Sequence, residues 1–249
     1  MISKNQIKQI RQLEQKKYRR REQMFVAEGP KVVGDLLAEG LRPLVVYATE
    51  EWQPVCALAE SQVVTADELC KVSFLQHPQQ VLALFPLPEA DARVTPVGQL
   101  SLALDGVQDP GNLGTIIRLA DWFGIDTIYC SEDTVDAWSP KVVQATMGSI
   151  ARVHIIYMSL SDLLGSLPAA FPVYGTVLDG DDIYSSELSA GEGIIIMGNE
   201  GNGISSEIRR KLNRRLLIPN FSRHATTAES LNVAIATAIV CSEFRRRDG

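Results

Sequence analysis

Asn112 and Arg118 are the polar residues of the segment DPGNLGTIIR that could act on a ligand, and this segment follows the apolar run LSLALDGV. An asparagine amide carries a donor and an acceptor, whereas a guanidinium is a planar, permanently charged donor that suits phosphate. Arg118 is the single cation between residues 104 and 125. The pattern predicts a group that orients a hydroxyl or an anion, although Asn112 also fits a helix N-cap and Arg118 a surface ion pair.

Two further loops follow predicted strands. MGNEGNGIS, residues 197–205, comes directly after Ile194–Ile196, and IPNFSRHATTAESLNVA, residues 218–234, comes directly after Leu216 and Leu217. Ligands gather at the carboxyl ends of strands in open parallel sheets, and glycines let the backbone approach a ligand closely. Neither loop has the glycine order of a dinucleotide or nucleoside triphosphate loop. Each loop alone fits an ordinary turn, but the three together favour one shared ligand site.

The order of apolar segments predicts the scaffold that must position these loops. Over residues 100–249, strands of a buried type alternate with helical patterns, which indicates a mostly parallel sheet covered by helices. Residues 1–85 predict a smaller α/β domain that begins with a polar helix over residues 1–23 and includes a helix near 51–60. Residues 86–99 contain three prolines and no apolar periodicity, and are predicted to be a linker.

Positive charge is clustered, although the 249-residue chain has a net charge of −6. Residues 1–31 hold nine Lys or Arg against three Glu, residues 209–223 hold six with no acidic residue, and Arg245–Arg247 form a third cluster. Exposed charges act over about 8 Å at physiological salt, so a local cluster can bind a polyanion even on an acidic chain. Solvated helix faces are the alternative interpretation of the same clusters.

The cysteines and the lack of long apolar runs indicate the cellular setting. Cys56, Cys70, Cys130 and Cys241 include no C-x-x-C pair, and with three scattered histidines they favour buried, reduced thiols over a metal site. The sequence begins without an apolar signal region, and no run approaches the roughly 18 apolar residues of a membrane span. We therefore expect a cytoplasmic protein with no metal and no membrane association.

The three loops resemble the three motifs of the SpoU (TrmH) family of RNA ribose 2′-O-methyltransferases, in the SPOUT superfamily. The motifs match, in order, Asn112, Gly114 and Arg118; Gly198, Glu200, Gly201 and Gly203; and Ile218–Pro219 with Ser230–Val233. The resemblance covers residues 100–245, and FVAEGPKVVGDLL is similar to part of the small RNA-binding domain often fused in front. The chain departs from the third motif, because NFSRHATTAE is longer than usual and contains no glycine.

The resemblance implies a fold and a cofactor. In this family the C-terminal part of the parallel sheet threads into a deep trefoil knot, where S-adenosylmethionine is held largely by main-chain groups of the second and third motifs. The implied cofactor residues are Thr176, Gly198, Gly203, Ile218 and Leu231. The departure in the third motif, residues 220–229, falls on the loop that helps to wrap the cofactor.

The resemblance also implies the residues for methyl transfer, which are Arg118, Asn112, Glu200, Ser230 and Asn232. The family assigns activation of the ribose hydroxyl to Arg118. Since a guanidinium stays protonated, either an RNA phosphate shuttles the proton or Arg118 only orients the hydroxyl and the phosphate. Asn112 would hold Arg118 or the ribose, and Glu200 would anchor its loop or reach a partner subunit. Ser230 would cap the last helix, expected over residues 230–244, and Asn232 would lie in its first turn facing the substrate.

The resemblance therefore implies a homodimeric, S-adenosylmethionine-dependent RNA ribose 2′-O-methyltransferase, and the basic N-terminal helix with a separate RNA-binding domain favours structured ribosomal RNA over transfer RNA as its substrate. The expected RNA contacts are Lys16, Lys17, Arg19, Arg20, Arg21 and, in the third loop, Arg223. Two alternatives stay open. One is an RNA-binding protein on this scaffold without methyl transfer, and the other is a nucleotide-binding oxidoreductase, which the glycine order disfavours.

Overall fold

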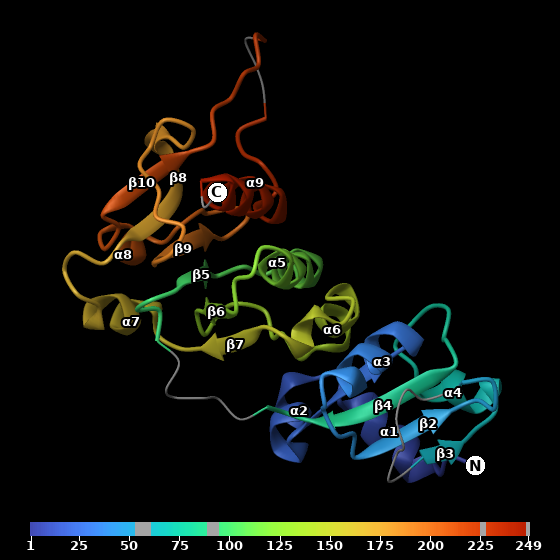
Figure 1. Ribbon diagram of the computed structural model, residues 1–249. Helices are drawn as coiled ribbons and strands as arrows, with labels where there is room; N and C mark the ends of the chain where they lie inside the picture. The colour runs from blue at the N-terminus through green and yellow to red at the C-terminus, as the bar shows by residue number, and fades with distance from the viewer. Residues whose placement is uncertain (53–60, 89–94, 225–227, 248–249) are drawn as a thin grey trace. The chain divides into compact units, whose positions relative to one another are not determined.

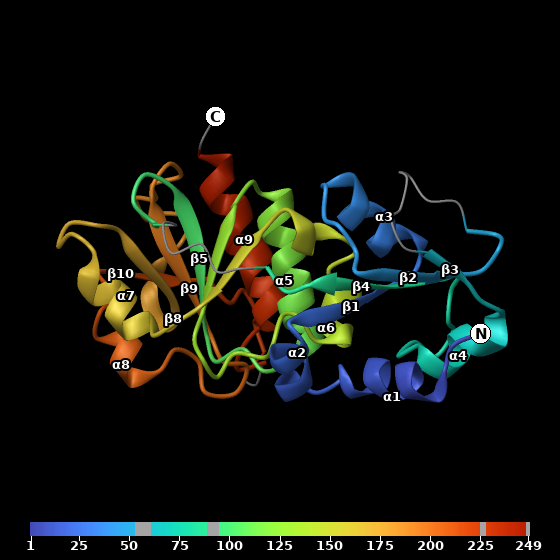
Figure 2. The same ribbon diagram turned by 90° about the horizontal axis from the view of Figure 1, so that it is seen from below.

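The computed structural model describes residues 1–52, 61–88, 95–224 and 228–247, and the chain forms two compact units (Figures 1 and 2). Unit 1 combines residues 1–90 with 136–152, and unit 2 combines residues 91–135 with 153–249. The chain therefore passes between the units three times, at residues 90–91, 135–136 and 152–153. Residues 89–94 of the expected linker and residues 53–60 of the helix expected near 51–60 lie outside the described residues.

Unit 1 contains a four-stranded sheet of order β1-β4-β2-β3, in which β4 is antiparallel to β1 and β2, and β3 is parallel to β2. Apolar side chains of the sheet and of its helices, among them Ile10, Leu13 and Leu82, form its core. Its elements are α1 (Lys4–Gln12), α2 (Lys16–Glu22), β1 (Met24–Glu28), α3 (Pro30–Ala38), β2 (Val45–Ala48), β3 (Ser61–Val63), α4 (Ala66–Val72), β4 (Val81–Pro86), α6 (Pro140–Ala145) and η1 (Ser149–Ala151).

A break between α1 and α2 replaces the single helix expected over residues 1–23, so that prediction is wrong. Arg19 of α2 reaches back and donates to the backbone oxygens of Leu13, at 2.6 Å, and Glu14, at 2.7 Å. Because the Arg19 side chain points inward, these two oxygens accept hydrogen bonds from its guanidinium and not from the backbone N–H groups that a continuous helix would supply. Leu13 is fully buried at the break. The break is therefore stabilised by an arginine that composition alone places on a solvated face.

Residues 136–152 complete unit 1, although they lie between two strands of unit 2 in the sequence. The ring of Trp138 lies 4.9 Å from that of buried Phe25, measured between centroids. Asp136 pairs with Arg19, whose Nε lies 3.0 Å from the carboxylate. This segment thus supplies both apolar and charged partners to the first 90 residues.

Unit 2 contains a six-stranded sheet of order β10-β8-β9-β5-β6-β7, and every described pairing is parallel. Helices α7 and α8 cover one face, and α5 and α9 pack together on the other (Figures 1 and 2). The predicted mostly parallel, helix-covered α/β sheet is confirmed. Its elements are β5 (Leu100–Asp105), α5 (Pro110–Trp122), β6 (Thr127–Cys130), β7 (His154–Tyr157), α7 (Leu160–Ser166), β8 (Val173–Asp182), β9 (Gly193–Gly198), α8 (Ser206–Arg209), β10 (Arg214–Leu217) and α9 (Val233–Arg246).

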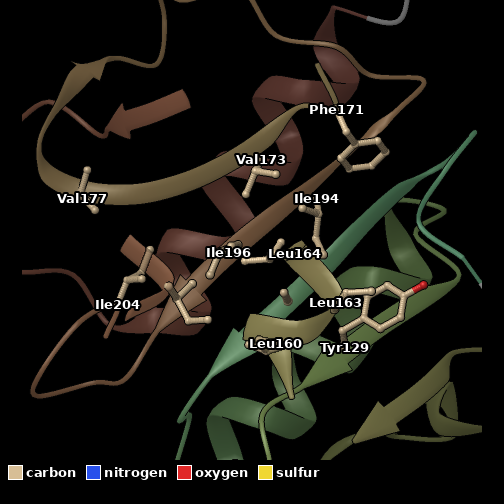
Figure 3. Packing of buried hydrophobic residues seen from close by; sticks show 12 residues of the cluster. Tyr129, Leu160, Leu163, Leu164, Phe171, Val173, Val177, Ile194, Ile196 and Ile204 are labelled. Atoms are coloured by element: carbon tan, nitrogen blue, oxygen red, sulfur yellow. The ribbon is translucent and has the colours of Figure 1, made fainter. Parts of the chain in front are cut away.

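The core beneath α7 and α8 is largely aliphatic (Figure 3). Ile194 and Ile196 of β9 belong to one cluster with Leu160, Leu163 and Leu164 of α7. Every residue of β9 is buried, as the continuous apolar run predicted for a central parallel strand. Each such side chain contributes roughly 1.5–3 kcal/mol to folding, which gives the loops that follow these strands a rigid base.

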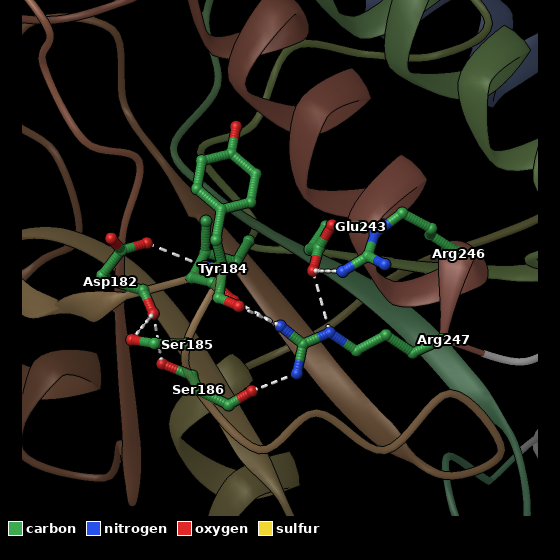
Figure 4. Close-up of polar contacts among 8 residues, drawn as sticks. Asp182, Tyr184, Ser185, Ser186, Glu243, Arg246 and Arg247 are labelled. Atoms are coloured by element: carbon green, nitrogen blue, oxygen red, sulfur yellow. Dashed lines mark hydrogen bonds and ion pairs between the residues drawn. The ribbon is translucent and has the colours of Figure 1, made fainter.

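The arginines at the end of α9 are used within unit 2 (Figure 4). Arg247 donates to the backbone oxygens of Ile183, at 3.0 Å, and Tyr184, at 2.8 Å, and pairs with Glu243 at 2.8 Å. Arg245 donates to two backbone oxygens of the turn that follows α5, both at 2.7 Å. Arg245 and Arg247 of the third basic cluster therefore hold α9 in place within unit 2.

Candidate active site

The parallel sheet has a switch point between β5 and β9. From β5 the chain continues to β6 and β7 on one side, whereas β9, β8 and β10 lie on the other. β5 and β9 end together, with Asp105 opposite Gly198. Ligand sites of open α/β sheets lie beyond the carboxyl ends of the strands at such a point. The fold thus brings together the first two predicted loops, independently of any family resemblance.

Asp109 caps α5, which begins after the loop that follows β5. Its Oδ1 accepts a hydrogen bond from the backbone N–H of Asn112 at 2.8 Å, and Pro110 occupies the first helical position, where no N–H is needed. The prediction that Asn112 caps this helix is therefore wrong. Asn112 lies in the first turn and is half-buried, and its amide is left to make other contacts.

Glu200, in the loop after β9, holds the loop after β5. Its Oε1 accepts from Asn112 Nδ2 at 3.0 Å and from the backbone N–H of Asp109 at 3.1 Å, and its Oε2 accepts from the N–H of Gln108 at 3.1 Å. Burial alone would raise the pKa of Glu200, but these hydrogen bonds outweigh it and lower the pKa below the ordinary 4.5. Glu200 is therefore an ionised anchor between two loops at neutral pH.

Asn232 joins the third loop to this pair. It caps α9, its side chain accepting from the N–H groups of Ala234 and Ile235 at 2.9 and 3.3 Å, and its Nδ2 donates to Asn112 Oδ1 at 2.9 Å. The prediction that Ser230 caps this helix and that Asn232 lies in its first turn is therefore wrong. Ser230 lies two residues before the cap and is exposed.

Glu200, Asn112 and Asn232 form a hydrogen-bonded chain that connects three loops. The carboxylate fixes the orientation of the Asn112 amide, and the Asn112 oxygen in turn fixes Asn232. Each amide nitrogen uses one hydrogen within the chain and keeps a second. Because all three side chains are exposed or half-buried, this arrangement can present two oriented amide donors to an oxygen-bearing ligand.

The loop after β9 has a tight conformation. Asn199 Oδ1 accepts from the N–H of Gly201 at 2.9 Å, and its Nδ2 donates to the backbone oxygen of Gly106 at 2.7 Å. Any side-chain carbon on Gly198 would lie 2.2 Å from the carbonyl carbon of Gly203, which itself has a φ of +67°. Two of the predicted cofactor residues are therefore glycines for steric and conformational reasons, and offer a ligand only main-chain atoms.

The other predicted cofactor residues lie within β8, directly after β10 and before α9. Thr176 of β8 is half-buried, with its hydroxyl 3.4 Å from the backbone oxygen of Ile196. Ile218 follows β10 and is half-buried, and Leu231 is 50% exposed. Leu178, two residues beyond Thr176, is 74% exposed. This combination of exposed apolar side chains, a hydroxyl and main-chain groups suits a ligand that contains an aromatic ring and a sugar.

Arg118 lies on the exposed side of α5, with Thr115 and Trp122 at helical spacing. Within the described residues its guanidinium forms no hydrogen bond or ion pair, so the expected alternative of a surface ion pair is not observed. Asn112 does not hold it either, since the partners of Asn112 are Glu200 and Asn232. The Arg118 side chain is therefore available to a ligand.

The cations predicted to contact RNA are mostly exposed. Lys17, Arg20 and Arg21 of α2 face solvent, and the charged ends of Lys17 and Arg21 both lie 4.8 Å from the ring centroid of Tyr18. Lys16 is half-buried. Arg223 is exposed on the third loop, of which residues 225–227 lie outside the described residues.

Arg19 differs from these neighbours. Its side chain is 3% exposed and donates to two backbone oxygens and to Asp136. The Arg19 side chain is therefore not available to RNA, which corrects the expected contact.

The remaining expectations concern thiols, metals and membranes. Cys130 and Cys241 are buried, Cys70 is exposed, which corrects the expectation of buried thiols, and Cys56 lies outside the described residues. In the described part of the chain, no group of three or more His, Cys, Asp or Glu side chains is placed to hold a metal. None of the helices described has the length and hydrophobicity of a membrane span.

Two residues that hold the site together were missed at the level of sequence. Asp109 had a usable signal, because Asp followed by Pro is typical of a cap and a first helical position. Asn199 also had one, since Asn before a glycine favours a turn that its side chain closes. Neither residue is part of the family motifs, which include their neighbours Asn112 and Glu200.

Two parts of the chain match the sequence models of known families. Residues 99–242 match the SpoU rRNA Methylase family, and residues 4–83 match the MRM3-like substrate binding domain. The chain is 32% identical to the 23S rRNA (guanosine(2553)-2′-O)-methyltransferase RlmP of Bacillus subtilis, over 98% of this chain and 97% of that protein.

Several solved structures match nearly the whole chain, and two of them are at least 32% identical to it. A TrmH-family protein from Porphyromonas gingivalis is 42% identical with a TM-score of 0.89, over 99% of both chains. An AdoMet-bound rRNA methyltransferase from Sinorhizobium meliloti is 32% identical with a TM-score of 0.86, over 99% of this chain and 97% of that one.

Proposed function

The chain belongs to the SpoU rRNA Methylase family, and on that premise we propose that it transfers a methyl group from S-adenosylmethionine to a ribose 2′-hydroxyl of ribosomal RNA. It is an RNA methyltransferase, and S-adenosylmethionine is its cofactor. The observation that carries the proposal is the row of hydrogen bonds through Glu200, Asn112 and Asn232, which joins the three motif loops at the carboxyl edge of the sheet.

The reaction forms an oxygen–carbon bond and breaks a sulfur–carbon bond. When bound, the cofactor supplies an electrophilic methyl group on a sulfonium centre. The ribose 2′-oxygen would displace the sulfur at that carbon, and its proton would pass to an RNA phosphate oxygen or to solvent. The second N–H of Asn112 and that of Asn232 are donors that hold the ribose oxygen, so these amides position the nucleophile.

Arg118 orients the RNA in this proposal. A guanidinium stays protonated at any physiological pH, so it serves as a donor to the phosphate and the 2′-hydroxyl and not as a base. Its exposure and its lack of partners among the described residues support that role. Glu200 keeps the amide of Asn112 in place, and the exposed hydroxyl of Ser230 is available to the cofactor or the substrate.

The described loops fit the cofactor. Gly198 and Gly203 bring main-chain atoms to the edge of the sheet, and Thr176 offers a hydroxyl there. Ile218 and the half-exposed Leu231 would become buried against an adenine ring, which favours binding. These five residues are the cofactor contacts that we propose, and the trefoil knot of the family is the path that we expect for the C-terminal part of unit 2.

A homodimer is part of the proposal. Trp122 on α5 is 84% exposed and Ile235 on α9 is 54% exposed, and these two helices pack together. Large exposed apolar side chains on adjacent elements are typical of an interaction surface. Sedimentation of the wild type and of Trp122→Glu tests this, since a monomeric variant is expected and a monomeric wild type would contradict it.

The remaining cations define the proposed contact with RNA. Lys16, Lys17, Arg20 and Arg21 would bind phosphates from α2, and Arg223 from the third loop. The cytoplasmic location expected from the sequence stays a prediction.

Methylation of ribosomal RNA tests the proposed function directly. Ribose methylation is mapped in ribosomal RNA from cells with and without the gene, and the purified enzyme is expected to restore the missing mark. Glu200→Gln should lower turnover about ten-fold, because its new NH₂ group would face N–H groups that now donate hydrogen bonds to the carboxylate. Glu207→Gln, which changes an exposed carboxylate on α8, is the matched control. Cofactor binding without methylation of any ribosomal RNA would favour the alternative of an RNA-binding protein.

A further inference from the structure

A cavity of about 220 Å³ lies in unit 1 beside the loop that follows α4. Its wall includes Glu28, Phe74 and Gln144, with Val26, Leu75, Pro140 and Lys141 completing the lining. The wall therefore combines a carboxylate, an aromatic ring, an amide and an ammonium group. The methyl-transfer site of unit 2 uses none of them.

Glu28 is a fixed acceptor in this wall. It is only 5% exposed, and its Oε1 accepts from the backbone N–H of Phe74 at 2.8 Å while its Oε2 accepts from the Ser73 hydroxyl. A carboxylate has about four lone-pair sites, so both oxygens keep capacity for a further donor. Burial raises the pKa of Glu28, against the opposing effects of the Ser73 and Phe74 hydrogen bonds and of the Arg11 charge.

Phe74 and Arg11 provide planar groups next to this acceptor. The Arg11 guanidinium carbon lies 5.0 Å from the Phe74 ring centroid, and Arg11 also donates to the backbone oxygen of Ser73. Aromatic rings and arginine planes are the surfaces on which proteins stack unpaired RNA bases.

A row of cations leads to the cavity. Lys4, Lys8 and Arg11 stand at helical spacing on α1, so they share one face, and all three are exposed. Lys141 adds a cation to the wall itself. Such a row follows a phosphate backbone, whereas the cavity at its end is of a size and chemistry suited to a base.

We propose that this cavity binds one unpaired nucleobase of the substrate RNA, a base with an exocyclic amino group that donates to Glu28 while Phe74 stacks on the ring. Lys4, Lys8 and Arg11 bind the adjoining phosphates. The choice of RNA as ligand rests on the proposed function. Uracil binds less well, because it has no exocyclic amino group and its O2 and O4 flank the single N3–H that could donate to the carboxylate.

Binding of oligo-A, oligo-C and oligo-U of equal length, at one salt concentration, tests the inference. The wild type should bind oligo-A and oligo-C about five- to ten-fold more tightly than oligo-U. Phe74→Leu should weaken oligo-A and oligo-C about ten-fold and reduce this preference. Lys141→Gln should weaken all three, whereas Lys71→Gln, which removes an equal charge from α4 outside the cavity wall, should change none.

A second variant keeps the test decisive if Phe74→Leu unfolds, which thermal melting would reveal. Gln144→Trp fills the cavity from a partly exposed helical position and should also remove the preference. Equal binding of the three oligonucleotides by the wild type, with normal methylation of ribosomal RNA, would overturn this inference alone. A clear preference without methylation of any RNA would overturn the proposed function and leave the inference standing.

Discussion

Asn112 and Asn232 are oriented by side chains of other loops and not by their own backbone alone. Asn112 receives its orientation from Glu200 and passes it to Asn232, so one carboxylate sets the direction of two amides. A hydrogen bond of this kind contributes about 0.5–1.5 kcal/mol, and more where one partner is charged. The loss of any one member therefore removes at least one hydrogen bond that orients another.

Arg118 should be sensitive to shape as well as to charge. Arg118→Ala is expected to lower turnover at least about ten-fold, and Arg118→Lys should also be poor, because an ammonium group lacks the planar fork of donors. The affinity for S-adenosylmethionine should stay within a few-fold in both variants. Single-turnover kinetics and calorimetry measure the two effects separately. Full activity of the lysine variant would show that only a positive charge is needed.

The types of the site residues were readable from the sequence, but their pairing was not. Asn112, Glu200 and Asn232 are all in the predicted catalytic set, and their roles there stay predictions. Their partners depend on where three distant loops meet, and no local pattern encodes this. The caps were misplaced for a local reason: Asp109 and Asn232 each compete with a nearby polar residue that is equally suited to capping.

At the scale of elements, α9 is held in place by its last turn. Glu243 is buried beneath Arg246 and Arg247, whose hydrogen bonds, that of Arg246 first, hold its pKa at about 2 against an ordinary 4.5. A carboxylate whose pKa is depressed by folding stabilises the protein above the unfolded pKa. That contribution is lost as the pH falls toward the folded pKa.

Glu243→Gln should therefore destabilise the protein in a pH-dependent way. The loss at neutral pH is expected to be about 1–2 kcal/mol and to shrink between pH 4.5 and about 2. Denaturant unfolding at several pH values measures it, with Glu187→Gln, an exposed carboxylate of the same unit, as the control. A difference that does not change with pH would mean that packing, and not charge, is responsible.

Helix α2 should contribute to RNA affinity through its exposed cations. The triple variant in which glutamine replaces Lys17, Arg20 and Arg21 should release fewer counterions on binding RNA. The slope of the logarithm of the binding constant against the logarithm of the salt concentration should therefore become less steep by about 2. Binding of the methyl donor should not change. Filter binding at several salt concentrations gives the slope. Replacing Arg42 and Lys71, exposed cations elsewhere in unit 1, should leave it unaltered.

Strands and long helices were the most predictable elements. The buried run at Ile194–Ile196 predicted a strand, and the apolar pattern around Ile116 predicted a helix. Central strands and packed helices differ in the spacing of their apolar residues along the sequence. The break between α1 and α2 was not predictable in this way. It depends on Arg19 finding Asp136, 117 residues later, and helical propensity contains no such information.

At the scale of the molecule, the three passages of the chain between the units distinguish this architecture from two domains on one linker. Unit 1 needs residues 136–152 for the partners of Phe25 and Arg19. The sequence predicts a single linker between two domains at residues 86–99, where the composition changes. Tertiary contacts of a short crossover segment have no compositional signal, so they could not be anticipated.

Two ion pairs between residues 136–152 and the rest of unit 1 allow a direct comparison. Asp136→Ala should cost about 3 kcal/mol, because it leaves the 3%-exposed side chain of Arg19 without its carboxylate. Glu39→Ala, which removes the exposed pair with Arg152, should cost less than about 1 kcal/mol. Chemical denaturation of the full chain compares them. Equal costs would show that burial does not govern the contribution of the Arg19–Asp136 pair.

The third passage of the chain also determines the order in which the protein can fold as it is made. When residue 90 leaves the ribosome, Arg19 has no carboxylate partner and Phe25 lacks the ring of Trp138. The missing segment ends at residue 152. At roughly 5–20 residues per second, its synthesis takes about 3–12 s more. During that interval β5 and β6 are already being produced, so the N-terminal unit cannot finish folding before the C-terminal one has begun. Nascent chains halted after residue 90 should consequently remain sensitive to protease, and those halted well beyond residue 152 should not.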